Sequence, residues 1–346
     1  MNRRTRLVPA LVAGALTLAL GVAVAPTTPA SAAGGRSGDW LERQLTGGLV
    51  HNDVYDFDDY GLTADTGMAL AEIGGHRPAV KKIKRALARH VDSWTTGVDF
   101  GSSDVYAGSV AKAVVLAQVA GADPTRFGGV DLVDRLEARV STADGTVGRL
   151  EDGTEGTDYA NTLGQAYAVA GLSRAGSPSA RSATRFLLQQ QCRAGFFRLY
   201  FSDKQAADQS CDGAARADRA PDTDATAVVV AQLQSVRHAS RAVKRAVADA
   251  VRWLVHHQKA NGSFGGGPTT SAANANSTGL AAFALARGGK CRAADNATDW
   301  VAGLQKKNGA IAYDRKAYRA GIDDQTLDQW RRATSQAAPS LRLPGC

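Results

Sequence analysis

Two closely spaced carboxyl groups are the best candidates for acid chemistry in this sequence. Asp222 and Asp224 flank Thr223 and lead directly into a run of small residues, 225–231. A carboxylic acid can donate a proton to a substrate when neighbouring groups set its pKa appropriately. We therefore expect Asp224 to be the acid and Asp222 its partner if the protein is an enzyme.

A structural role for the same residues competes with this chemistry. Asp65, Asn161 and Asn276 occupy similar positions at the starts of other expected helices. Asp and Asn at such positions accept hydrogen bonds from free backbone N–H groups and complement the helix dipole. We therefore also expect Asp224 to be a helix cap. A second acidic segment, residues 56–59, is out of register, and Asp65 is the expected counterpart of Asp224.

Long polar loops precede the same helices and predict a surface for a ligand or a partner. They cover residues 50–61, 148–159, 198–221 and 265–276. Loops held by a rigid scaffold commonly carry binding residues, and a concave mouth is the default ligand site. The alternative is that these polar groups are solvated caps. The candidates are Asp58, Asp59, Tyr60, Asp65, Asp158, Tyr159, Asn274 and Asn276.

The cysteines predict disulfides and no metal site. The four residues allow three pairings, and proximity favours Cys192–Cys211 and Cys291–Cys346. Each bond would stabilise the fold by about 3 kcal/mol in the loop-closure model. A metal site would need Cys or His at ligand spacing, which neither the cysteines nor the six histidines provide. The acidic loops also lack the spacing of a calcium-binding EF-hand.

The N-terminus indicates export. Three arginines at positions 3, 4 and 6 precede an almost wholly apolar stretch, 7–25, and Ala30-Ser31-Ala32 follows as a small-residue cleavage site. We expect residues 1–32 to be a signal peptide cleaved after Ala32 and the mature protein to be secreted. No later stretch is long and apolar enough to span a membrane.

Composition excludes a nucleic-acid partner and supports one large domain. The chain has 346 residues, 44% of them hydrophobic, and a net charge of +8. Removing the three leader arginines leaves 38 basic against 33 acidic residues, a scattered excess of +5. We expect a monomer with a single domain over residues 33–346.

A sequence repeat determines the expected architecture. Its form is an aromatic and an aliphatic residue, then Gln, Gly and an apolar residue at fixed spacing. The three clear copies are Phe186-Leu187 with Gln191, Gly195 and Phe197; Trp253-Leu254 with Gln258, Gly262 and Phe264; and Trp300-Val301 with Gln305, Gly309 and Ile311. We expect the Gln amide to bond the backbone of the next repeat and the Gly to permit the turn.

The helices between these copies fall into two classes. One class is apolar nearly all round and covers 63–73, 109–120, 161–173, 224–233, 277–286 and 327–341. The helices that carry the motif are amphipathic, with one apolar stripe each. Six alternating pairs predict an inner buried ring and an outer half-exposed ring, an all-α (α/α)6 toroid that closes on itself.

The repeat resembles the QW motif of the terpenoid cyclase and protein prenyltransferase superfamily over residues 40–341. The composition is also similar to that of exported proteins known only by this repeat. The resemblance implies the toroid fold, which is similar to that of squalene–hopene cyclases, zinc prenyltransferases, and the cobalamin carriers intrinsic factor and transcobalamin.

The resemblance to class II cyclases implies that Asp224 is the proton donor. The segment 221–227 resembles their D-x-D-D-T-A signature, but Ala225 replaces the third Asp. Aromatic residues that could stabilise a carbocation are scarce, mainly Tyr106, Tyr167 and Phe283. The zinc ligand set of the prenyltransferases is absent. Six-hairpin toroids that act on polysaccharides remain a second alternative, since acidic loops are plentiful.

The sequence therefore predicts an exported, non-catalytic binding protein. Its expected partner is a small hydrophobic or corrinoid-like ligand, or a second exported or membrane-associated protein. Intrinsic factor and transcobalamin hold a corrinoid with an extra β-domain that this chain lacks. The alternative is a class II terpene cyclase that acts through Asp224.

Overall fold

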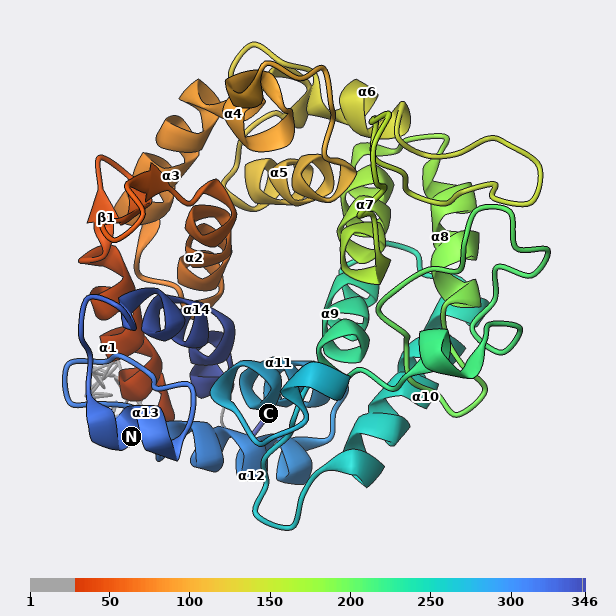
Figure 1. Ribbon diagram of the computed structural model, residues 1–346. Helices are drawn as coiled ribbons and strands as arrows, with labels where there is room; N and C mark the ends of the chain where they lie inside the picture. The colour runs from red at the N-terminus through yellow and green to blue at the C-terminus, as the bar shows by residue number, and fades with distance from the viewer. Residues whose placement is uncertain (1–28, 344) are drawn as a thin grey trace, which may run out of the picture.

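Two concentric rings of helices form the structure (Figure 1), a computed structural model that describes residues 29–343 and 345–346. The inner ring contains α2 (Tyr60–Ile73), α5 (Ala107–Val119), α7 (Thr162–Ala175), α9 (Thr223–Gln234), α11 (Ala275–Arg287) and α14 (Leu327–Ala337). The outer ring contains α1 (Pro29–Glu42), α3 (Arg77–Arg89), α4 (Val91–Thr95), α6 (Leu132–Glu137), α8 (Ala180–Gln189), α10 (Arg241–His257) and α12 (Cys291–Ala302). The predicted (α/α)6 toroid is confirmed.

Short elements complete the chain between the rings. The strands β1 (Leu45–Thr46), β2 (Leu49–Asn52) and β3 (Phe57–Asp58) form a small antiparallel sheet in that order, with Thr46 opposite Leu49 and Asn52 opposite Phe57. The helix α13 (Arg315–Ala320) lies in the connection to α14. These elements belong to loops that run from an outer helix to the next inner helix.

The inner helices are buried on nearly every side because small residues let their backbones approach closely. A Cβ atom added to Gly279 of α11 would lie 2.3 Å from the Cα atom of Ala337 in α14. One added to Gly164 of α7 would lie 3.1 Å from the Cα atom of Gly108 in α5. The abundance of Ala and Gly is therefore a requirement of the closed inner ring.

The outer helices bury a single stripe each. In α10, Val243, Ala250 and Leu254 are buried, whereas Arg245 and Arg252 on the other face are exposed. This pattern is the amphipathic one that the sequence predicts.

The recurring glutamines link consecutive outer helices. The Nε2 atom of Gln191 donates to the carbonyl oxygen of Ala246 in α10 at 2.8 Å. Gln258 donates in the same way to the carbonyl oxygen of Ala293 in α12, also at 2.8 Å. The predicted role of the Gln amide is confirmed.

The third copy of the repeat closes the ring. Gln305 donates to the carbonyl oxygen of Ala33 in α1 at 2.8 Å. The Ser37 hydroxyl donates to the carbonyl oxygen of Gly309 at 2.7 Å. A Cβ atom added to Gly309 would lie 2.0 Å from the Arg36 carbonyl oxygen. Only glycine therefore allows the chain to approach α1 this closely, and α14 then packs against α2.

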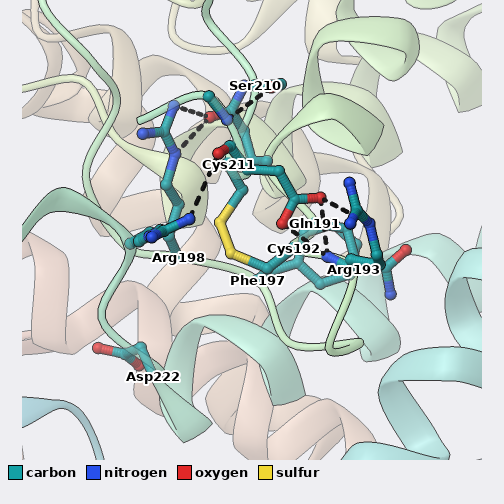
Figure 2. The surroundings of a disulfide bond; sticks show 12 residues. Gln191, Cys192, Arg193, Phe197, Arg198, Ser210, Cys211 and Asp222 are labelled. Carbon is teal, nitrogen blue, oxygen red and sulfur yellow. Dashed lines mark hydrogen bonds and ion pairs between the residues drawn. A yellow bond between two sulfur atoms is a disulfide. The ribbon is translucent and has the colours of Figure 1, made fainter. Parts of the chain in front are cut away.

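One of the two predicted disulfides is present. Cys192 and Cys211 are bonded, with their Cα atoms 4.9 Å apart (Figure 2). Beside them the buried Arg198 guanidinium donates to the Gln190 side chain at 2.8 and 2.9 Å and to the Gln209 carbonyl oxygen at 2.8 Å. Together these contacts fix the long loop that leads into α9.

The predicted Cys291–Cys346 disulfide is wrong for this structure, in which both residues are free thiols. The Cys346 thiol instead donates to the carbonyl oxygen of Ala286 at 3.3 Å. Partial burial, together with the neighbouring Cys291 thiol, raises the pKa of Cys346 to about 12. The ring is therefore closed by packing and hydrogen bonds rather than by a covalent bond.

The expected signal peptide lies almost wholly outside the described residues. Helix α1 begins at Pro29, so its first turn crosses the expected cleavage site after Ala32. Among the described residues, none of the helices has the length and apolarity needed to cross a bilayer.

Candidate functional site

The inner ring encloses a central cavity of about 580 Å³. Its lining residues recur at fixed sequence separations from each helix start, because a helix returns to the same face every three to four residues. We count these separations from the N-cap of each helix. The side chains of Asp59, Asn161, Asp222 and Asn274 accept backbone N–H bonds at the starts of α2, α7, α9 and α11.

The positions of the caps correct three predictions. The cap of α9 is Asp222, which accepts the Ala225 N–H at 2.8 Å, so Asp224 is not the cap. The counterpart of Asp224 in α2 is Gly61 and not Asp65, which lies one turn deeper. The predicted equivalence of Asn161 is also wrong, because Asn161 is itself a cap.

The cavity wall has four layers, at the second, sixth, ninth and thirteenth residues after each cap. We call them the acid layer, the ion-pair layer, the apolar layer and the rim. The helices α5 and α14 are counted from Tyr106 and Thr326. In this order the layers contain Gly61, Gly108, Leu163 and Asp224; Asp65, Lys112, Tyr167, Val228 and Leu280; Met68, Val115, Ala231, Phe283 and Ser335; and Glu72, Val119, Arg174, Ser235, Arg287 and Pro339.

Asp224 is the titratable group of the acid layer. Its Oδ1 atom is buried and has no hydrogen-bond partner. Burial is the main cause that raises the pKa of Asp224 to about 6; the Ser277 hydroxyl opposes the shift, and the Asp222 carboxylate adds to it. A Cβ atom added to Gly266 would lie 2.6 Å from Asp224 Oδ2, so the loop backbone packs directly on this carboxyl group. A carboxyl group that is substantially protonated near pH 6 can act as a general acid.

Asp222 supports this carboxyl group from outside the cavity. Its side chain is buried and occupied by the cap of α9, and burial raises its pKa. The backbone of Gly267 packs against its Oδ2 atom, since a Cβ there would approach within 2.3 Å. Asp222 therefore acts on Asp224 through charge and helix geometry.

The ion-pair layer holds a salt bridge that faces the cavity. The Nζ atom of Lys112 lies 2.8 Å from the Oδ1 atom of Asp65 and 5.7 Å from the centre of the Tyr167 ring. Burial alone would lower the pKa of Lys112, but the neighbouring Asp65 carboxylate outweighs it, and the pKa is raised. Burial also raises the pKa of Tyr167 to about 12. This layer is polar yet internally neutral.

Three of the predicted ligand-binding residues hold the loop before α2 in place. The Asp58 carboxylate lies 3.0 Å from His51 Nδ1 and raises the pKa of that imidazole. Asp59 caps α2 and pairs with Arg332 of α14. Tyr60 stacks on the His90 ring at 5.5 Å. These contacts give structural roles to all three residues.

The remaining predicted residues also lie away from the cavity, apart from Asp65. Asp158 pairs with Lys204 at 3.0 Å, and the Tyr159 side chain is 77% exposed. Asn274 caps α11, and the Oδ1 atom of Asn276 is buried without a hydrogen-bond partner. These loop residues therefore fasten the ring, and the inner helices line most of the cavity.

Sequence reasoning did not single out Lys112, Arg174 or Arg287 as site residues. A usable signal was present, because each follows a helix start by six or thirteen residues. The caps had to be assigned correctly before that spacing could be read.

In the part of the chain that the structure describes, no group of three or more acidic, His or Cys side chains could hold a metal ion.

Known structures share this architecture. A protein from Actinoplanes is 18% identical over 91% of this chain and 99% of its own, with a TM-score of 0.62. The type II terpene cyclase MstE from Scytonema is 17% identical over 90% and 97%, with a TM-score of 0.63. An unsaturated glucuronyl hydrolase specific for heparin is 10% identical over 90% and 95%, with a TM-score of 0.62.

At these identities the likeness shows the fold alone. No protein-family model matches the sequence, and no curated protein is similar to it. The chain is thus an α/α toroid of the type found in both terpene cyclases and glycosidases.

Proposed function

We propose that the protein binds a small, largely apolar molecule inside the central cavity. The observation that carries the proposal is a cavity of about 580 Å³ whose apolar layer contains Met68, Val115, Ala231 and Phe283, with Ser335 as its single polar member. This volume falls within the range of roughly 300–1,000 Å³ that is usual for small-molecule sites. Transfer of an apolar ligand from water onto this layer supplies the driving force.

The volume favours a drug-sized molecule over a corrinoid. A corrinoid macrocycle with its side chains would have to lie across the loop end instead of inside the ring. The proposed ligand is therefore a compact apolar molecule, with Asp224 at one end of its binding site and the rim at the other.

Native mass spectrometry tests this binding. The mature protein should carry a small molecule after isolation from its producer's medium or after incubation with decanol. Ala231→Phe fills the apolar layer and should abolish the complex. Ala302→Phe, the same change at an exposed position of α12, should leave it intact. A bare chain in every sample, or equal binding by Ala231→Phe, would contradict the proposal.

Asp224 favours a second candidate function, protonation of an alkene in the bound ligand. Its support is the half-buried Asp224 carboxyl group, which has a buried Oδ1 atom without a hydrogen-bond partner and a pKa of about 6, at the wall of the cavity. Ala225 stands where the class II signature has a further Asp, and the Asp222 side chain is committed to the cap. The acid is therefore weaker than the chemistry of simple alkenes demands.

Geranylgeranyl dihydroxybenzoate, the substrate in one MstE complex, is a suitable probe for this reaction. Cyclisation would yield an isomer of unchanged mass and altered chromatographic retention, and Asp224→Asn would bind the probe without converting it. Unchanged probe after prolonged incubation with the wild type would reject this candidate.

Polysaccharide cleavage has less support. Such enzymes use a pair of carboxyl groups on either side of the bond. Among the described lining residues the carboxyl groups are Asp65, Glu72 and Asp224. They lie in three different layers, and Lys112 neutralises the first.

A further inference from the structure

The rim differs from the other layers because it holds a net positive charge, with two arginines against one glutamate. Arg287 ends α11, and Arg174 and Glu72 lie one residue before the ends of α7 and α2. Figure 1 shows these three helices as alternate members of the inner ring. Both arginines line the cavity, where Arg174 is half-buried and Arg287 is exposed.

Neither arginine of the rim has a carboxylate partner. Within the described residues no carboxylate oxygen lies at ion-pair distance from Arg174 or Arg287. Burial lowers the pKa of Arg174, Glu72 opposes this, and Arg287 and Arg237 lower it further. The Arg287 guanidinium instead lies 5.6 Å from the centre of the Phe283 ring, at the border of the apolar layer.

Arginines at helix C-termini also complement the helix dipole. That role is satisfied equally well by side chains that point into solvent. It does not account for two guanidinium groups that face one cavity and disfavour each other's charge. An anion between them would remove this repulsion and accept paired N–H bonds, which the planar guanidinium donates well.

The rest of the cavity defines the remainder of such a ligand. The apolar layer adjoins the rim, and the ion-pair layer is already neutral. Asp224 and Ser235 mark the acid layer and the rim on α9, eleven residues apart. At 1.5 Å per residue this is about 16 Å. A chain of roughly ten carbons fits this length with its head group at the rim.

We propose that the cavity's ligand is an amphiphile with one anionic head group, which Arg174 and Arg287 hold at the rim while its apolar chain lies along the apolar layer toward Asp224. This proposal rests on the proposed binding function and adds the chemical class of the ligand. Carboxylates and phosphates share the required chemistry, since both accept paired N–H bonds.

Calorimetric titration with decanoate, decyl phosphate and decanol tests the head group. We expect the tighter of the two anions to bind about ten- to a hundredfold more strongly than decanol. The double variant Arg174→Gln/Arg287→Gln should bind all three ligands as weakly as the wild type binds decanol. Which anion binds more tightly identifies the head group as a carboxylate or a phosphate.

Two control variants make the result specific. Arg85→Gln/Arg89→Gln removes the same charge from the exposed face of α3 and should keep the anion preference. Arg174→Lys/Arg287→Lys keeps the positive charge and should retain part of the preference for anions over decanol. Both variants should unfold at the same temperature as the rim variant, which excludes loss of the fold.

The outcomes distinguish a failure of the head-group proposal from a failure of the proposed binding function. If decanol binds as tightly as both anions, the cavity binds apolar ligands and the head-group proposal is wrong. The proposal is also wrong if the preference survives in the rim variant and disappears in Lys112→Met. If none of the three ligands binds, the proposed binding function itself fails.

Discussion

The α2 wall and the α9 wall of the cavity each present one aspartate, and their neighbours give the two residues opposite roles. Asp65 on α2 meets Lys112 at 2.8 Å, so that layer is neutral. Among the described residues no cation pairs with Asp224 on α9, and its Oδ1 atom is buried without a hydrogen-bond partner. The role of each aspartate is therefore set by the side chain that the adjacent inner helix places next to it, and not by the residue type alone.

This difference also separates stability from function. Neutralising a buried carboxylate with a lysine stabilises the ring but leaves little reactivity. A lone buried carboxyl group costs stability in its ionised form and persists only where the fold tolerates that cost. Asp224 is thus the lining residue that stability alone explains least well.

The largest effect should come from breaking the pair on the α2 wall. Lys112→Met leaves the Asp65 carboxylate without its counter-charge. The cost is large because both side chains are mostly buried, with 24% of Lys112 and 20% of Asp65 exposed. We expect a loss of about 3 kcal/mol in the free energy of unfolding, measured with urea. Asp65→Asn/Lys112→Met should recover most of it. If the single variant were as stable as the wild type, the two walls would not differ as described.

The opposite sign is expected on the α9 wall. The native pKa of Asp224 is about 6 and the unfolded value about 4. The native state therefore binds more protons between these values, and stability falls as the pH rises from about 4 to about 6. Asp224→Asn removes this cost and should stabilise the protein by about 2 to 3 kcal/mol at pH 8.

The same variant should match the wild type below about pH 3, where Asp224 is largely protonated in both states. Urea unfolding curves at several pH values measure the difference directly. A wild type that is the more stable protein at pH 8 would show that Asp224 is paired or solvated.

The smallest effect distinguishes the two neighbouring carboxyl groups of α9. Asp222→Ala removes the N-cap and should cost about 1 kcal/mol, whereas Asp222→Asn keeps the hydrogen bond and should cost less. Thermal unfolding at one pH is sufficient to rank the variants. If Asp222→Ala stabilised the protein as Asp224→Asn does, the assignment of cap and acid would be reversed.

The fold was predictable because its signals repeat. Each Gln of the motif bonds the next outer helix, and each inner helix is rich in small residues, so three copies of the motif were enough to predict the ring. The failure at Cys291 and Cys346 has a local cause. Proximity in sequence said nothing about the Ala286 carbonyl group that receives the terminal thiol.

The site was only partly predictable, because its register depends on caps that the sequence does not distinguish. Asp222 and Asp224 are both plausible caps, and choosing the wrong one shifts every lining position. Asp224 and Asp65 were found by residue type. Lys112 and the rim arginines required knowledge of which helices lie opposite one another, which only the closed ring provides.

The most direct test of this account is the pKa of Asp224 itself, followed by ¹³C NMR of the aspartate side-chain carboxyl groups. We predict one resonance that titrates near pH 6, is missing in Asp224→Asn, and moves to higher pH when decanol occupies the cavity and excludes water. A resonance for Asp224 that titrates below pH 4 and ignores decanol would contradict both the lone buried acid and the apolar binding site beside it.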